Sequence, residues 1–403
     1  MQKLVLIPLW CLVFIVPWEG MFVIQELGGE TLATAARLLG AATFATAVVA
    51  VTATASMRRL HLGFIPLAAF VLWNWASLAW TIAPDESMDR CVTLSLLLVL
   101  VWLIWEFAPS LKAQRSLMWA FILGNALTFT AEFVEFFRGE AIEGRYIAAA
   151  SDANFTAVSF VLAIGFMLYL MNTLNRGLRI AAWGYILVAG LGVLLTSSRA
   201  GLAGLAICIL VNLVNFRRIG WGQAFAILSC LALGWLLLPQ SVVELLTSRV
   251  EQEERTRAVE IRQELWAAGL KAWETNPLLG VGAGSYRIAS EREGGRRMVA
   301  HNTFINVLVE NGIVGFGILL FMCVMFLRLV WHMPPGERGL WIALLAAFSV
   351  QWNVTSQEYQ KVTWLMYALI LAQSAATARE PPAASPRGVA GPSRRVAGKR
   401  NGG

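Results

Sequence analysis

The sequence predicts an all-α polytopic membrane protein that crosses the bilayer about twelve times. The chain of 403 residues is 58% hydrophobic and only 14% charged, whereas soluble domains average about 25% charged residues. Its apolar residues come in long blocks, and about 20 apolar residues in a helix match the roughly 30 Å hydrocarbon core of a bilayer. The short loops between these blocks are basic on one side only, which gives the chain a consistent orientation.

The apolar blocks place the spans in order along the chain. The predicted spans are approximately 4–18, 38–56, 62–81, 91–107, 116–136, 155–171, 180–196, 200–215, 222–239, 312–330, 339–352 and 362–377. Lys3 precedes the first block, but no small-residue cleavage site follows it, so we interpret this block as a span rather than a signal peptide. Residues 31–37 are expected to lead into the second span.

The distribution of charges orients the predicted spans. With the N-terminus in the cytoplasm, every short cytoplasmic loop is basic, and only Glu106, Glu337 and Glu380 of the 25 acidic residues lie on that side. This is the asymmetry that the positive-inside rule requires. The basic residues that give the net charge of +7 gather in the cytoplasmic loops and the tail. The net charge therefore reflects membrane orientation and does not indicate a nucleic-acid partner. Contact with membrane lipids is expected instead.

The spans divide the chain into four parts. Residues 1–239 hold the first nine spans, 240–311 form one long loop on the outer side, 312–377 hold the last three spans, and 378–403 form a basic tail. The tail is rich in Pro, Gly, Ala and Arg and lacks apolar periodicity, so we expect it to be disordered and cytoplasmic. A polar segment as long as 240–311 between spans is a common location for function.

The long loop is expected to carry two helices. From Val250 to Thr275 it alternates charged residues with an apolar stripe that includes Leu265 and Trp266, which predicts a helix. Pro277 and the glycines of LLGVGAGSY end this helix in a turn. The glycines favour a turn that packs against the spans over a phosphate loop, because no strand precedes them and no Gly-Lys-Ser/Thr follows. A second helix is predicted to start near His301 and Asn302.

His301 is a candidate catalytic base. Of the three histidines, His61 and His332 fall on the cytoplasmic side, so His301 is the one expected on the outer face. A neutral imidazole near pH 7 can remove a proton from a hydroxyl group. An interfacial histidine that makes a structural hydrogen bond is the alternative.

Arginines on the same outer face could hold a phosphate group, because their planar fork of donors matches phosphate oxygens. Arg199, in TSSRAG, lies at a turn between two apolar spans, where a charge is costly. Arg145 precedes the sixth span, Arg262 lies on the polar side of the loop helix, and Arg37 lies at the outer edge of the second span. The alternatives are snorkelling to lipid headgroups and, for Arg262, a helix ion pair.

Other residues carry weaker signals. Gln357 and Glu358 lie in the last outer loop and could orient a substrate, although a solvated loop is favoured. The five cysteines lie in or beside apolar segments, which argues against a disulfide framework and a zinc site. We predict no metal and no cofactor.

Three motifs in order resemble the O-antigen ligase and polymerase superfamily of bacterial membrane glycosyltransferases. They are TSSRAGLAGLAICILV, NPLLGVGAGSY and HNTFINVLVENGIVGFGILL, which run from about Thr196 to Leu320. The upstream segment GRYIAAASDANF resembles an arginine-containing loop of the same family. About twelve spans and one long loop most resemble the O-antigen ligase branch.

The resemblance implies an inverting, metal-independent glycosyltransferase of the bacterial cell inner membrane, with its site and its long loop facing the periplasm. Its donor would be a polysaccharide on undecaprenyl diphosphate, and its acceptor a sugar of lipid A–core. By motif, His301 would be the catalytic base, while Arg199 and Arg262 would bind the diphosphate, with Arg145 as a third candidate. Arg37, Asn302 and Glu358 are further candidates, although Glu358 matches the family pattern poorly.

Three alternatives remain. A polymerase of the superfamily would use the same donor, and a protein O-oligosaccharyltransferase would use a protein acceptor. A twelve-span transporter is disfavoured, because transporters place polar, broken helices near the bilayer midplane in two related halves, and the polar residues here gather at one face.

Overall fold

The structure is a computed structural model of the whole chain. It describes residues 2–21, 23–27, 30–138, 152–214, 222, 225, 229 and 252–378. The ninth predicted span, apart from those three single positions, the start of the long loop at Gln240, and all but the first residue of the predicted tail lie outside the described residues.

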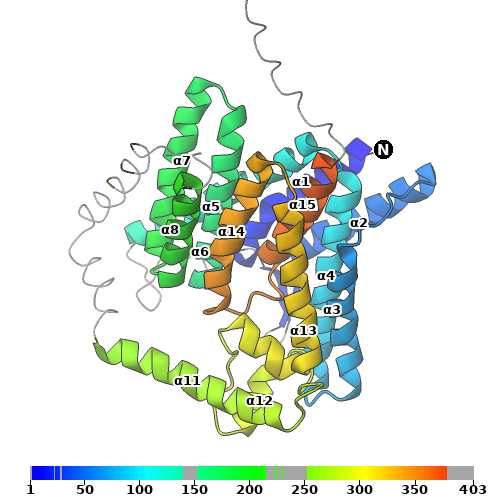
Figure 1. Cartoon of the computed structure of the whole chain (residues 1–403), viewed down its shortest axis with the longest axis vertical. Coiled ribbons are helices and arrows are strands. Elements are labelled where there is room, and N and C mark those ends of the chain that lie inside the picture. Colours follow the sequence, from blue (N-terminus) through cyan, green and yellow to red (C-terminus); the bar gives the residue numbers. More distant parts are fainter. Residues whose placement is uncertain are drawn as a thin grey trace, which may run out of the picture.

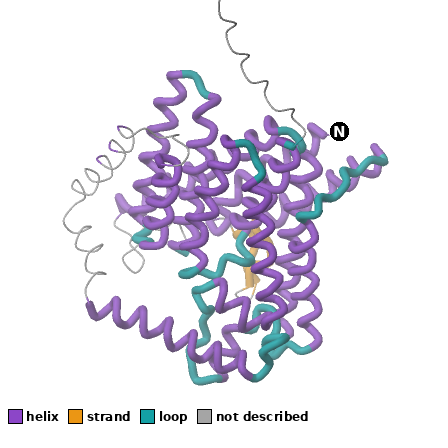
Figure 2. The backbone as a smooth tube through the Cα atoms, in the orientation of Figure 1, coloured by secondary structure: helices purple, strands orange, loops and turns teal. Residues whose placement is uncertain are grey.

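The described part is predominantly helical (Figures 1 and 2). Its elements in chain order are α1 Gln2–Ile15, η1 Val16–Met21, β1 Val23–Leu27, β2 Glu30–Thr34, α2 Ala35–Thr54, α3 Phe64–Ala76, η2 Ser77–Ala79, α4 Pro84–Phe107, α5 Leu111–Arg138, α6 Ala153–Leu170, η3 Met171–Thr173, α7 Arg176–Leu195, α8 Arg199–Val214, α11 Gln252–Glu274, α12 Tyr286–Arg292, α13 Thr303–Trp331, α14 Pro335–Trp352 and α15 Lys361–Thr377. Eleven of the predicted spans therefore coincide with helices.

Several of these helices can cross a bilayer. Within the described residues, 6 helices are long and apolar enough to do so: α2, α4, α5, α6 with η3, α7 and α13. Three shorter apolar helices, in α1, α3 and α8, have between 10 and 17 residues. The protein is thus a multi-pass helical membrane protein, while the count of about twelve spans and the four-part division of the chain stay predictions.

One element departs from the predicted all-helical class. Strands β1 and β2 pair antiparallel, with Val23 opposite Thr34 and Leu27 opposite Glu30. The sequence carries the signal for such a hairpin, because the segments on either side of Gly28-Gly29 contain β-branched residues and a Gly-Gly pair is typical of a tight hairpin turn. The segment predicted to lead into the second span is therefore partly a strand.

The centre of the bundle is formed around α6. This helix is apolar on all sides, and 89% of its most apolar window is buried by neighbouring helices. Gly192 of α7 lies against Phe160 of α6, and Gly201 of α8 lies against Ala157 of α6. Small residues at such contacts let helices approach closely within a membrane.

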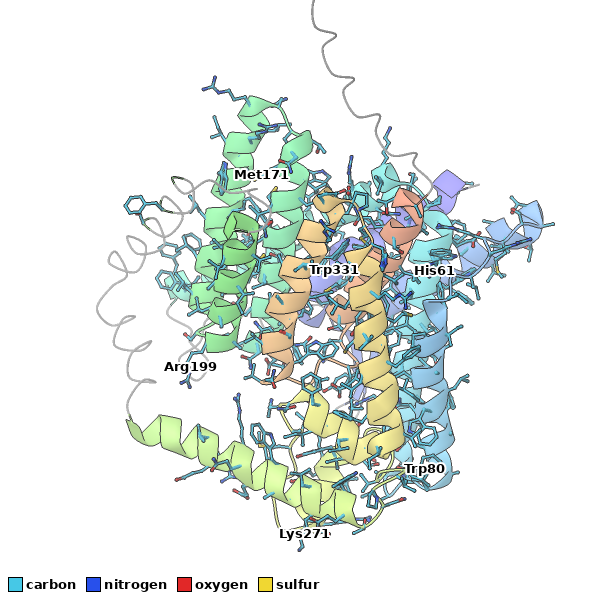
Figure 3. The ribbon with its side chains drawn as sticks, viewed as in Figure 1. His61, Trp80, Met171, Arg199, Lys271 and Trp331 are labelled. Carbon is cyan, nitrogen blue, oxygen red and sulfur yellow. The ribbon has the colours of Figure 1, made fainter. Side chains whose placement is uncertain are left out.

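The bundle has two ends that differ in structure. Helices α11 and α12 lie across one end, which we call the α11 end (Figure 1). Arg199, Trp80 and Lys271 lie toward this end, whereas His61, Met171 and Trp331 lie farther from α11 (Figure 3). This arrangement agrees with the prediction that Arg199 lies on the opposite side from His61 and from His332, which follows Trp331.

The α11 end is joined to the bundle through a break in α13. The helix is interrupted at Gly312, whose φ is 65° and ψ is −170°. The segment 276–286 (NPLLGVGAGSY), which we call the glycine loop, supplies the lost hydrogen bonds. Val281 N–H donates to the Val309 carbonyl at 3.0 Å and Gly282 N–H to the Glu310 carbonyl at 2.9 Å. In return, Ile313 N–H donates to the Pro277 carbonyl at 2.9 Å. The predicted role of these glycines in packing the loop against the spans is confirmed.

Replacing Gly312 with alanine should lower the stability of this junction. A positive φ costs an L-residue about 1–2 kcal/mol, and the added Cβ would also collide with the backbone of Leu278 and Gly280. We expect a lower melting temperature and a lower folded yield in detergent. Gly317→Ala, in the same helix, is the matched control because a Cβ there meets nothing within 4 Å. Equal melting temperatures for the two variants would contradict the account.

Candidate functional site

His301 lies directly before the first turn of α13. Its φ is 48°, a left-handed conformation that is uncommon for a residue other than glycine and often marks a constrained site. The next residue, Asn302, is the N-cap, and its side-chain oxygen accepts hydrogen bonds from the N–H groups of Phe304 and Ile305 at 3.0 and 3.1 Å. The cap ends the loop and leaves the half-buried imidazole just outside the helix.

The last loop, 353–360, supports the segment around His301. Asn302 Nδ2 donates to the Asn353 carbonyl at 3.3 Å, and Thr303 Oγ1 donates to the Thr355 carbonyl at 2.8 Å. Gln357 N–H donates to Thr303 Oγ1 at 2.9 Å. Because both side chains of this first turn bind the loop backbone, the loop sets the position of His301.

Helix α11 brings Arg262 to the same place. Trp266 Nε1 donates to the carbonyl of Ala300, the residue before His301, at 2.8 Å. Arg262 lies one turn earlier on the same face of α11, since residues four apart in a helix are neighbours. Tyr286 of α12 fixes the helix further by donating its hydroxyl to the Leu265 carbonyl at 2.8 Å. The Arg-x-x-x-Trp spacing therefore places the half-buried Arg262 one helical turn from the residue that contacts the His301 segment.

Arg199 is the first residue of α8 and its side chain is exposed. The preceding Ser198 accepts a hydrogen bond from Gly201 N–H at 3.1 Å and donates to Asn154 Oδ1 at 2.9 Å. A cation at a helix N-terminus is opposed by the helix dipole. An arginine at this position adds nothing to helix stability, whereas it suits the binding of an anion together with the N–H groups of the first turn.

Several buried polar atoms near this end have no hydrogen-bond partner. In α14 and the loop after it, these are both amide atoms of Gln351, Nε1 of Trp352 and Oγ of Ser356. Buried polar groups in folded proteins are nearly always hydrogen-bonded to protein or to water. Their presence beside the loop that holds Asn302 suits a site that takes a polar ligand.

Glu358 belongs to a buried charged cluster rather than a solvated loop, which corrects the favoured prediction. Its Oε1 lies 3.5 Å from Nη1 of Arg90, and the same nitrogen lies 3.2 Å from Oε2 of Glu310. Burial raises the pKa of Glu358 to about 8, against the opposing effect of Arg90. Neither Arg90 nor Glu310 is among the predicted site residues. An ionisable residue at the edge of an apolar span is the signal that could have found Arg90.

The structure brings together only part of the predicted set. His301, Asn302 and Glu358 are linked through the last loop and α13, and Arg262 joins them through α11. Arg199 stands on α8 and Arg37, also exposed, on the first turn of α2. Arg145 lies outside the described residues.

No group of three or more His, Cys, Asp or Glu residues in the described part could hold a metal ion. The four cysteines in that part are not joined in disulfides, and Cys230 lies outside it: the four are Cys11, Cys91, Cys208 and Cys323. These findings concern the described residues alone, so the prediction that the protein uses no metal stays a prediction.

Comparison with protein families gives a match over part of the chain. Residues 183–320 match the O-antigen ligase family. This match supports membership of the O-antigen ligase superfamily, and it covers the helices and loops that carry Arg199, Arg262 and His301 together with the glycine loop. Comparison with curated proteins gives no significant match. The superfamily comprises glycosyltransferase-like membrane enzymes, and its ligase and polymerase branches are not distinguished by this match.

Proposed function

We propose that the protein is an O-antigen ligase, which transfers a polysaccharide from undecaprenyl diphosphate to a sugar of lipid A–core at the periplasmic face of the bacterial inner membrane. The observation that carries the proposal is the hydrogen bond from Trp266 to the Ala300 carbonyl. It joins the helix of Arg262 to the residue before His301, and both candidate residues lie within the matched residues, which supports a shared site.

In the proposed reaction, His301 removes a proton from a hydroxyl group of the acceptor sugar. The hydroxyl oxygen then attacks the anomeric carbon of the donor from the side opposite the diphosphate, so the configuration inverts. The bond between the anomeric carbon and the diphosphate oxygen breaks, and undecaprenyl diphosphate leaves with the bonding electron pair. Arg262 and Arg199 stabilise the charge that develops on the leaving diphosphate, a task that fixed cations can perform.

The location of the site suits both substrates. The donor has a lipid tail that stays in the hydrocarbon and a sugar that must reach water. A site at the end of the bundle, between α11 and the spans, allows both. Arg145 and Arg37 are further candidates for diphosphate binding, and Asn302 is proposed to position His301 rather than to bind substrate.

The test is a lipopolysaccharide gel from a ligase-deficient bacterial host that expresses the chain with a matched donor and core. We expect a restored ladder of long bands on lipid A–core. Polysaccharide that stays on undecaprenyl diphosphate but grows longer would indicate a polymerase instead, and polysaccharide attached to protein would indicate a protein O-oligosaccharyltransferase.

Replacing Trp266 with phenylalanine tests the contact that joins α11 to His301. The ring stays while its N–H group is lost, which leaves the Ala300 carbonyl unpaired at a cost of about 1–3 kcal/mol. We expect transfer to fall by about tenfold with normal insertion, because 1.4 kcal/mol corresponds to a factor of ten. Trp273→Phe is the matched control, since that indole donates to the Pro277 carbonyl at the far end of α11. Equal activity in both variants would contradict the proposed role of the contact.

A further inference from the structure

Arg90 is buried between two carboxylates at the α11 end. Its side chain is 12% exposed, whereas those of Glu310 and Glu358 are 1% and 3% exposed. Its guanidinium lies 3.7 Å above the centre of the Tyr359 ring. Two carboxylates and an aromatic ring thus surround the guanidinium. Burying these charged groups costs desolvation free energy, which their mutual contacts must offset.

These contacts join three elements. Arg90 belongs to α4, Glu310 to the first part of α13, and Glu358 to the last loop. Glu310 Oε1 accepts a hydrogen bond from Tyr286 N–H of α12 at 3.2 Å, and Asn306 Nδ2 of α13 donates to Glu358 Oε1 at 2.8 Å. The cluster therefore fixes the first part of α13 against α4, α12 and the loop, within about three turns of His301.

The charges of the cluster do not balance if both glutamates are ionised. One guanidinium would face two carboxylates, and Glu358 Oε2 is buried without a hydrogen-bond partner, as is Asn306 Oδ1. An unpaired buried carboxylate is costly. A protonated carboxyl group can pair with a primary amide through two antiparallel hydrogen bonds, and the bond from Asn306 Nδ2 to Glu358 Oε1 already supplies one of them.

We propose that Arg90, Glu310 and Glu358 form a positioning unit that carries one proton on Glu358 and, through Asn306, holds the first turn of α13 and His301 in place. The second hydrogen bond of the pair would then run from protonated Glu358 Oε2 to Asn306 Oδ1. The positioning role rests on the proposed function, whereas the presence of the proton does not.

The environment of Glu358 supports this assignment. The groups that face it are Arg90 on α4, Glu310 on α13 and Tyr359 on its own loop, and Arg287 of α12 acts on Tyr359. Burial raises the pKa of Glu358 more than Arg90 lowers it, and Glu310 raises it further. These influences together favour the protonated carboxyl group.

The first experiment measures melting temperature against pH in detergent and does not depend on any transfer activity. Because the pKa of Glu358 is raised from 4.5 in the unfolded chain to about 8, the folded state holds the proton more tightly. Its stabilising effect is complete below the unfolded pKa and is lost as pH rises to about 8. We expect the melting temperature of the unchanged protein to fall by about 5 °C or more over this pH range. Glu358→Gln mimics the neutral acid and should not show this fall.

Glu293→Gln is the matched control for the melting experiment. Glu293 also forms an ion pair, with Lys271 at 2.8 Å, but that pair lies on the surface. This variant should keep the pH dependence of the unchanged protein. A Glu358→Gln variant with the same pH dependence as the unchanged protein would overturn the proposal that Glu358 carries a proton.

The second experiment measures transfer against pH. We expect transfer by the unchanged protein to fall by about tenfold per pH unit above about pH 8, while Glu358→Gln keeps its activity there. Glu358→Ala should lose transfer at every pH, because Asn306 loses its partner. Loss of transfer by Glu358→Gln at neutral pH would overturn the positioning role. Absence of transfer by every variant, with the melting result as expected, would reject the proposed function and leave the proton on Glu358 supported.

Discussion

Replacing His301 with alanine is expected to abolish transfer of polysaccharide to lipid A–core while the protein inserts in the membrane at normal levels. A positioned general base contributes about 10²–10⁴-fold to a rate, and no other histidine lies on the predicted outer side. The imidazole is half-buried and stands outside the helix that follows it. The change should therefore remove the base without disturbing the cap that Asn302 provides. A lipopolysaccharide gel at equal expression is the measurement.

His332→Ala is the matched control for the base. His332 ends the same helix at the opposite side of the bundle, where its Nδ1 lies 2.7 Å from the Arg328 carbonyl. We expect this variant to transfer polysaccharide at the normal rate. Transfer by His301→Ala at a rate close to that of His332→Ala would remove the base assignment and favour a purely structural role for His301.

The second large effect is expected at the arginines. Arg262→Ala and Arg199→Ala should each lower the rate of transfer by about 10²–10³-fold, the usual cost of removing one group that stabilises developing charge. Loss of a contact made only in the transition state lowers kcat and kcat/KM together. Measurement of initial rates at several donor concentrations separates this effect from weaker ground-state binding, which would raise KM alone.

Lysine variants and a control on the same helix sharpen this test. Arg262→Lys keeps the charge but loses the planar fork, so we expect it to recover only part of the activity. Lys271→Ala also removes a cation from α11, but that lysine pairs with Glu293 at the surface, and its loss should have no effect on transfer. Arg262→Ala with the activity of Lys271→Ala would show that Arg262 only forms a helix ion pair.

The sequence predicted the helices well because their cause is local. Each apolar block must form a helix to satisfy its backbone in a bilayer, so eleven blocks coincide with helices. The helix containing Arg262 and Trp266 was predicted from its stripe, and the start of α13 from its position after a polar loop, where Asn302 is the cap. The hairpin after η1 was missed because its signal, a Gly28-Gly29 pair between two short segments that contain β-branched residues, is weak.

The contacts that build the site could not be predicted from the sequence, because they join residues that are far apart in the chain. The pair Asn311-Gly312 is also a turn signal, but glycines are frequent in membrane helices, so the sequence alone does not predict a break at Gly312. Its cause is the glycine loop, about 30 residues earlier, which binds the freed backbone groups. Arg90 was missed for a similar reason, because its partners Glu310 and Glu358 are more than 200 residues away in the chain. Glu358 was expected in solvent because a polar loop gives no sign of burial.

The central claim is best tested with the purified protein in proteoliposomes that contain a polysaccharide on undecaprenyl diphosphate, with and without lipid A–core. The account predicts polysaccharide covalently attached to lipid A–core and release of an equal amount of undecaprenyl diphosphate. When the acceptor is left out, it predicts that the polysaccharide on undecaprenyl diphosphate does not increase in length. Longer chains on undecaprenyl diphosphate, with lipid A–core unchanged, would contradict the account and identify the protein as a polymerase.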